Sequence, residues 1–113
     1  MELEQLYMDA NLLCNGELSL QEFLLYYDMV VSRILTRDPK RMILPEGEYV
    51  RPETLEGSCV LPDNFYFAIL YFIGGTVLGN ECMFRDSDAR ADEAFRAIWR
   101  EVARGKRLAG DRW

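Results

Sequence analysis

The sequence from residue 11 to residue 22 has residue types and spacing that resemble a calcium-binding loop. In an EF-hand loop a glycine makes a sharp turn at position six, and a bidentate glutamate closes the loop at position twelve. Gly16 and Glu22 fit that spacing. Position three would be Leu13, whose side chain offers no oxygen, and Glu22 is the one carboxylate placed to bind. Because calcium requires several oxygen ligands, mostly carboxylates, these residues argue against a calcium site.

The same stretch fits a corner between two helices better. Ser19 and Glu22 are spaced as a capping box, in which the serine side chain accepts from the glutamate amide and the glutamate side chain reaches back. Asn15 and Gly16 tolerate the left-handed backbone that ends a helix. We therefore predict that one helix ends near residue 14 and another begins at Ser19.

Three further acids, Asp86, Asp88 and Asp92, could suggest a carboxylate metal site. Acids near the start of a helix more commonly complement the helix dipole and face solvent, and we favour that interpretation. The four-residue spacing of Asp92 and Arg96 also predicts an ion pair along one helix.

Composition excludes several kinds of chemistry. The chain has no histidine, so a Ser-His-Asp or Cys-His site and a histidine-containing zinc site are impossible. Its three cysteines, Cys14, Cys59 and Cys82, form no Cys-x-x-Cys pair, and we expect reduced, buried thiols. The net charge of −6 without a basic stripe disfavours a nucleic-acid binder. We expect that the protein is not an enzyme and that it binds neither a cofactor nor a metal.

Apolar periodicity predicts a mainly α domain, a four-helix bundle-like fold with helices over residues 2–13, 19–37, 61–78 and 86–104. Residues 38–61 contain three prolines and two glycines, with short β-prone pieces at 42–44, 49–50 and 58–61. A connector of this length predicts an extended loop or small β-hairpin between the second and third helices, or an arm that reaches a neighbouring molecule.

The third helix carries no charge from residue 64 to residue 80. A membrane span needs roughly 20 apolar residues, and shorter runs are usually core helices, so we favour a core helix and expect no membrane contact. Gly74 and Gly75 lie inside it and indicate either close approach of another helix or a local kink.

The end of the chain has the opposite charge to the rest. Residues 104–113 contain four basic residues and one acidic residue, a net charge of +3, and end in Trp113. This segment is either a frayed tail or a docking peptide, since Arg and Trp are enriched at interface hot spots. We divide the chain into a helical domain, 1–103, with its arm or hairpin at 38–61, and a basic docking tail, 104–113.

Residues 61–107 resemble the head-to-tail connector proteins of tailed bacteriophages, the adaptors beneath the portal. The likeness rests on a Leu-Pro-acid start, an apolar helix with a tyrosine-rich middle, a short break with an aspartate, an amphipathic helix with Ala and Phe, and a basic end. The matching residues are Leu61 to Asp63, Ala68 to Tyr71, Arg85, Asp86, Ala91, Ala94, Phe95 and Arg104 to Arg107. The helix from Phe23 to Ile34 is similar to the family's first long helix.

The resemblance implies a structural virion protein at the head–tail junction, assembled in the host cytoplasm. Its members form a ring, commonly of twelve copies, that joins the portal to the tail or neck proteins and lines the DNA channel without reading the DNA sequence. It further implies a tail that docks on the portal or a neighbour, through Arg104, Lys106, Arg107, Leu108, Arg112 and Trp113. It also implies an inter-subunit loop, with Ile43, Leu44, Tyr49, Val50 and Arg51.

The third helix is more apolar, and the chain more acidic, than the resemblance leads one to expect. The acidic balance suits an adaptor, because like charge in a lumen repels the phosphates of passing DNA. It also suits a different class of protein, a small acidic phage-encoded inhibitor or interaction protein that binds a basic partner.

Overall fold

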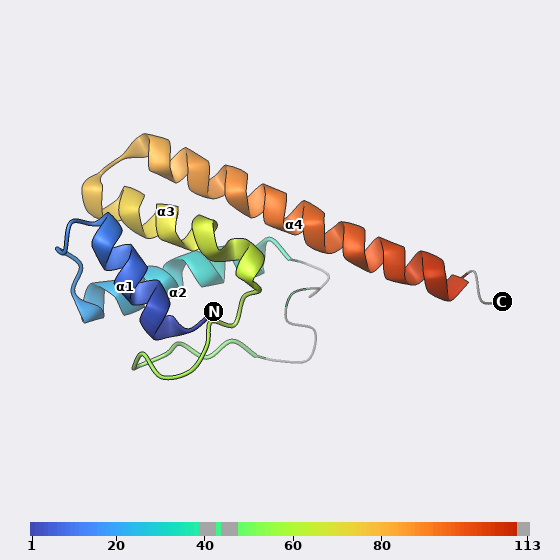
Figure 1. Ribbon diagram of the computed structural model, residues 1–113, viewed down its shortest axis with the longest axis horizontal. Helices are drawn as coiled ribbons and strands as arrows, with labels where there is room; N and C mark the ends of the chain where they lie inside the picture. Colours follow the sequence, from blue (N-terminus) through green and yellow to red (C-terminus); the bar gives the residue numbers. More distant parts are fainter. Residues whose placement is uncertain (39–42, 44–47, 111–113) are drawn as a thin grey trace.

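The part of the chain that the structure describes forms four α-helices (Figure 1). The computed structural model describes residues 1–38, Ile43 and residues 48–110, the last six of them by their backbone alone. The elements are α1 (Leu3–Leu13), α2 (Leu20–Thr36), the 3-10 turn η1 (Asp63–Phe65), α3 (Tyr66–Leu78) and α4 (Glu81–Gly110). The predicted mainly α, bundle-like class is confirmed.

Helix α3 is the central element of the domain. It packs against α1, α2 and α4, and its most deeply buried side chains, Ile69 and Ile73, are inaccessible to solvent. An element that is apolar nearly all round must be covered on most sides, and the other three helices supply that cover. None of the helices within the described residues has the length and apolar character needed to cross a bilayer.

The corner between α1 and α2 is a capped turn, as predicted. Ser19 Oγ accepts a hydrogen bond from the Glu22 amide at 3.1 Å, and Glu22 Oε1 accepts one from the Ser19 amide at 3.3 Å. Asn15 and Gly16 take positive φ angles of 60° and 77°. Asn11 Oδ1, at the first ligand position of the calcium hypothesis, accepts from the backbone N–H of residue 18 at 3.0 Å. The side chains of Asn11 and Glu22, the first and last ligand positions of the calcium hypothesis, therefore stabilise the turn by accepting backbone hydrogen bonds.

The connection between α3 and α4 is shorter than the sequence indicated, because α3 ends at Leu78 and α4 begins at Glu81. Gly79 ends α3 in the left-handed conformation, with φ 63°, and the Asn80 amide donates to the Gly75 carbonyl at 3.0 Å. Asn80 Oδ1 then accepts from the amides of Cys82 at 3.0 Å and Met83 at 3.2 Å. Our prediction that the last helix begins at Asp86 or Ser87 is wrong, because Asn80 caps it at Glu81.

Helix α4 also ends later than predicted. We expected it to stop near Arg104, with Gly105 as the terminator, but its backbone remains helical to Gly110. A glycine inside a helix costs about 1 kcal/mol relative to alanine, and one such residue does not break a helix of this length. No change of secondary structure marks the predicted boundary at residue 104.

Gly74 and Gly75 lie where other elements approach α3 closely. A Cβ on Gly74 would lie 2.8 Å from Leu13 Cδ2, at the end of a flexible side chain. A Cβ on Gly75 would lie 3.0 Å from Phe84 Cδ2 and 3.1 Å from both the Asn80 carbonyl oxygen and the Phe84 amide nitrogen. Close approach of another helix, one of the two alternatives drawn from the sequence, is therefore present at this glycine pair.

The predicted β-hairpin is not seen in the described part of residues 38–61. In the described part of this segment, the sheet-like pairing is an isolated antiparallel bridge between Ser58 and Glu2. The Leu3 amide donates to the Gly57 carbonyl at 3.1 Å, and the Cys59 amide donates to the Met1 carbonyl at 2.8 Å. The β-prone piece near residue 58 thus pairs with the start of the chain, because its backbone groups find partners there.

Replacing Gly75 by alanine should destabilise the fold more than replacing Gly74. Alanine favours helix by about 1 kcal/mol at either site, and at Gly74 the Leu13 side chain can move aside. At Gly75 the new methyl meets the α3–α4 backbone, and we expect a net loss of about 1–3 kcal/mol. Urea denaturation of the two variants measures the difference, and equal stabilities would contradict this account of the corner.

Removing the Ser19 hydroxyl should weaken the start of α2. We expect Ser19→Ala to lower the free energy of unfolding by about 1 kcal/mol, the usual contribution of an N-cap. Thermal unfolding of Ser19→Ala beside Ser32→Ala, an exposed serine in the middle of α2, gives the comparison. A loss of the same size in both variants would argue against a specific role for the cap.

Candidate docking surface

The first half of α4 is held firmly against the bundle. Ser87, Ala91, Ala94 and Phe95 are buried, and they recur at the three- and four-residue spacing of one helix face. Ser87 Oγ donates a hydrogen bond of 2.6 Å to the carbonyl of Ala68 in α3. Small side chains on this face let the two helices approach, and the hydroxyl is satisfied inside the contact.

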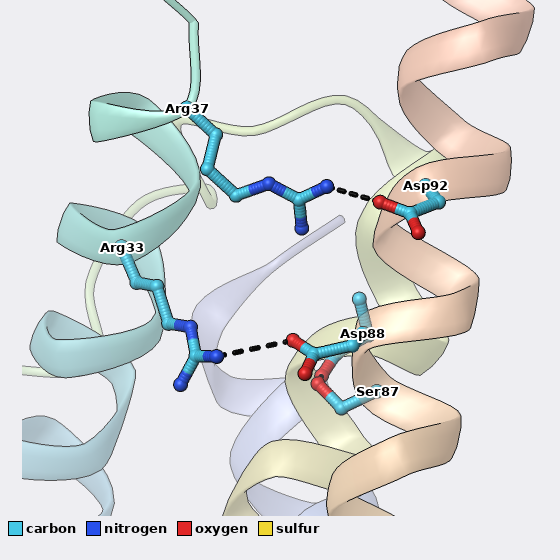
Figure 2. Close-up of polar contacts among 6 residues, drawn as sticks. Arg33, Arg37, Ser87, Asp88 and Asp92 are labelled. Carbon is cyan, nitrogen blue, oxygen red and sulfur yellow. Dashed lines mark hydrogen bonds and ion pairs between the residues drawn. The ribbon is translucent and has the colours of Figure 1, made fainter.

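Two ion pairs join α4 to α2 with matched spacing (Figure 2). Arg33 Nη2 lies 3.3 Å from Asp88 Oδ1, and one helical turn further along Arg37 pairs with Asp92. The predicted pair between Asp92 and Arg96 is not formed, because Asp92 bonds across to α2 instead. These pairs are solvent-exposed, so each contributes on the order of 0.2–1 kcal/mol, but together they align the two helices.

The same contacts bear on the proposed carboxylate metal site. Asp88 and Asp92 form ion pairs with Arg33 and Arg37 of the neighbouring α2 segment, and Asp86 is exposed. In the part of the chain that the structure describes, no three His, Cys, Asp or Glu side chains are grouped so as to hold a metal ion.

The last part of α4 extends beyond the other helices of the domain (Figure 1). At 1.5 Å per residue, α4 with its 30 residues is about 45 Å long, whereas α3 with its 13 is about 20 Å. Trp99 is 45% exposed, Arg100 and Arg104 are exposed, and the apolar side chain of Val102 is half-buried. We call residues 99–110 the α4 arm.

The predicted docking tail forms part of this arm. Arg104 is exposed, and the backbone of Lys106, Arg107 and Leu108 continues the helix. Arg112 and Trp113 lie outside the described residues. A helical backbone thus carries most of the segment that the sequence suggested as a separate tail.

The residues of the predicted inter-subunit loop face in different directions. The Ile43 amide donates to Asp38 Oδ2 at 2.8 Å, and the Tyr49 hydroxyl donates to Asp28 Oδ1 at 2.9 Å. Burial, together with the hydrogen bond to Asp28, raises the pKa of Tyr49. Ile43 and Tyr49 thus tie the segment to its own chain.

Two other residues of that loop face solvent. Val50 is 78% exposed and Arg51 is also exposed, whereas Leu44 lies outside the described residues. Val50 and Arg51 are therefore the described loop residues that a second molecule can reach.

Sequence reasoning missed three exposed apolar side chains. Periodicity alone places Trp99 on the same helix face as Phe95, and Leu12 looks from the sequence like part of a buried helix end, whereas Met8 was not considered. Met8 and Leu12 are 57% and 80% exposed, so the expectation for Leu12 is wrong. The exposure of Met8 and Leu12 could have been predicted from the sequence, because helical spacing places both on the side of α1 opposite its buried residues. Trp99 does lie on the helix face that the periodicity predicts, but no other element of the domain extends far enough along α4 to bury it fully.

The described surface thus offers the end of a helix with Trp99, Arg100 and Arg104 exposed, and aromatic and arginine side chains are enriched at binding surfaces. Comparisons with protein-family models, with curated proteins and with solved structures found no match to this chain. The chemistry of the surface is therefore interpreted from its own residues.

Truncating neighbouring aromatics of α4 should separate folding from docking. Phe95 is buried, with Phe65 edge-on at 5.2 Å, and Phe95→Ala should cost about 3–5 kcal/mol. Trp99 contributes mainly its pairing with Phe95, and Trp99→Ala should cost about 1 kcal/mol. Denaturation curves measure both. Equal large losses would mean that Trp99 is a core residue and not part of a docking surface.

Proposed function

We propose that this chain is a structural virion protein, a ring-forming adaptor that joins the portal of a tailed bacteriophage to its tail. The observation that carries the proposal is the α4 arm, a helix that leaves the bundle with Trp99, Arg100 and Arg104 exposed. A subunit of an assembly needs such a docking element, and aromatic and arginine side chains dominate the energetics of binding surfaces.

The other predicted features have places in this proposal. The α4 arm docks on the portal or on a neighbouring subunit. Val50 and Arg51, two exposed residues of the segment after α2, contact a neighbour or the tail and neck proteins. The acidic body of the ring faces the channel, where its charge keeps passing DNA from adhering. Such an adaptor acts in the virion, at the head–tail junction, after assembly in the host cytoplasm.

A second function is favoured by a different observation. Residues 1–28 carry six acidic residues and no basic ones, a net charge of −6. An acidic inhibitor or interaction protein would use this acidic segment to bind a basic partner, with fast, salt-sensitive one-to-one association. The α4 arm would then be dispensable for binding, which separates the two functions experimentally.

The adaptor function can be tested with the portal protein of the same genome. If a portal gene lies near this one, its purified product is mixed with the chain and imaged by electron microscopy. We expect added ring density at one end of the portal, lost in Trp99→Ala/Arg104→Glu and retained in Arg85→Glu, an exposed arginine near the start of α4. Absence of a portal gene, or failure of the chain to bind the portal, would overturn the proposal.

A further inference from the structure

Helix α3 has one side that the other described helices leave exposed. The helices α1, α2 and α4 all pack against α3. On its remaining side Phe67 and Leu78 are 49% and 39% exposed, and Tyr71 is half-buried. These three residues share one face, because they are four and seven residues apart. A helix that is apolar nearly all round needs cover on every side, so this face has the character of a contact surface.

The exposed side of α3 continues onto α4. The Arg90 guanidinium lies over the Phe67 ring, 5.7 Å from its centroid, and the Phe67 and Tyr71 rings are stacked with their centroids 5.8 Å apart. Beside Phe67 an open hollow lies between the two helices, and Asn64 and Ala97 are among the residues that line it. Aromatic and arginine side chains thus form one continuous surface, of the kind that dominates binding energetics.

This surface carries one charge of each sign. Asp86 and Arg90 are both exposed, and they lie four residues apart, about 6 Å along one face of α4. Among the described residues, Asp86 forms no ion pair, whereas Arg90 Nη1 lies 3.6 Å from Glu93 Oε2. A guanidinium has five N–H donors, so Arg90 can bind a second carboxylate. We call Phe67, Tyr71, Asp86 and Arg90 the α3–α4 face.

Charges arranged in this way complement themselves in an antiparallel pair of helices. When two copies of α4 run antiparallel about a twofold axis at residue 88, Asp86 of each copy lies opposite Arg90 of the other. A parallel pair would instead place each charge opposite its own kind. The α3–α4 face therefore complements a second copy of itself in the antiparallel arrangement, with two equivalent ion pairs.

The apolar groups of the face share the same centre. Ser87 Oγ donates to the Ala68 carbonyl at 2.6 Å, so a twofold axis at residue 88 of α4 passes beside Phe67 of α3. This axis brings the two Phe67 rings together. Tyr71, four residues further along, then lies beside Asn64 of the second copy, where the hollow opens. One axis thus accounts for both the charged and the apolar fit.

We propose that two copies of this chain associate through the α3–α4 face in an antiparallel, twofold-symmetric contact. The contact is isologous, since the same surface is used on both copies, and it therefore closes a pair and does not propagate. It goes beyond the proposed function and does not rest on it, because the α4 arm takes no part in the contact.

Sedimentation equilibrium of the chain alone, without portal, tests the charged pairs. We expect a monomer–dimer equilibrium for the wild type. Asp86→Arg and Arg90→Asp each place like charges opposite one another, and each should weaken dimerisation at least about tenfold. Mixed in equal amounts, the two variants pair an aspartate with an arginine at both positions, so a heterodimer should form. Absence of that heterodimer would overturn the proposed contact.

Exchanging the two charges within one chain gives a second test. Asp86→Arg/Arg90→Asp leaves the net charge at −6 and restores opposite charges across the twofold axis. We expect the doubly substituted chain to dimerise again, more tightly than either single variant. Failure of the folded double variant to dimerise would rule out the antiparallel pairing.

Matched controls alter similar residues elsewhere. Phe67→Ala should weaken dimerisation, whereas Leu25→Ala, at a 43% exposed leucine of α2, should not. Glu53→Arg and Arg85→Asp change exposed charges outside the α3–α4 face by the same amounts and should leave dimerisation unchanged. Circular dichroism checks the fold of every variant. A wild-type chain that stays monomeric at millimolar concentration, or oligomers that none of the α3–α4 face variants weakens, would overturn the inference.

Discussion

The close contact between α3 and α4 is the constraint on which the rest of the structure depends. Gly75 brings the two helices together at their corner, where its missing side chain leaves room for the α4 backbone. Further along, Ser87 Oγ satisfies its hydrogen bond on the Ala68 carbonyl inside the interface. Because α3 is also the helix that α1 and α2 cover, a shift of α4 would disturb the whole core.

This contact also determines where α4 can act. Its first half is fixed by packing on α3 and by the two arginine–aspartate pairs to α2, so its direction is set by two elements. The second half continues as a helix, so its backbone already has its secondary structure before any binding. Binding by such a pre-organised element avoids part of the conformational entropy cost that a flexible tail would incur.

Local features of the fold could be predicted because their causes are local. The helices α1 and α2 and the capping box of Ser19 and Glu22 follow from periodicity and from contacts within four residues. The third helix was predicted from residue 61, whereas α3 begins at Tyr66 after the 3-10 turn η1. The start of α4 was missed because Asn80 suits both the end of one helix and the cap of the next. The partner of Asp92 was missed because Arg37 is 55 residues away, and a pair within one helix looked equally good.

The sequence by itself determined the helical class, the corner between α1 and α2, and the opposite charges of the two ends. Those properties depend on composition and on neighbours along the chain. Tertiary structure decided which apolar residues are covered: Phe95 is buried and Trp99 is half-exposed, although both belong to one stripe. A helical period defines a face, but the length over which that face is buried depends on where the partner helices end.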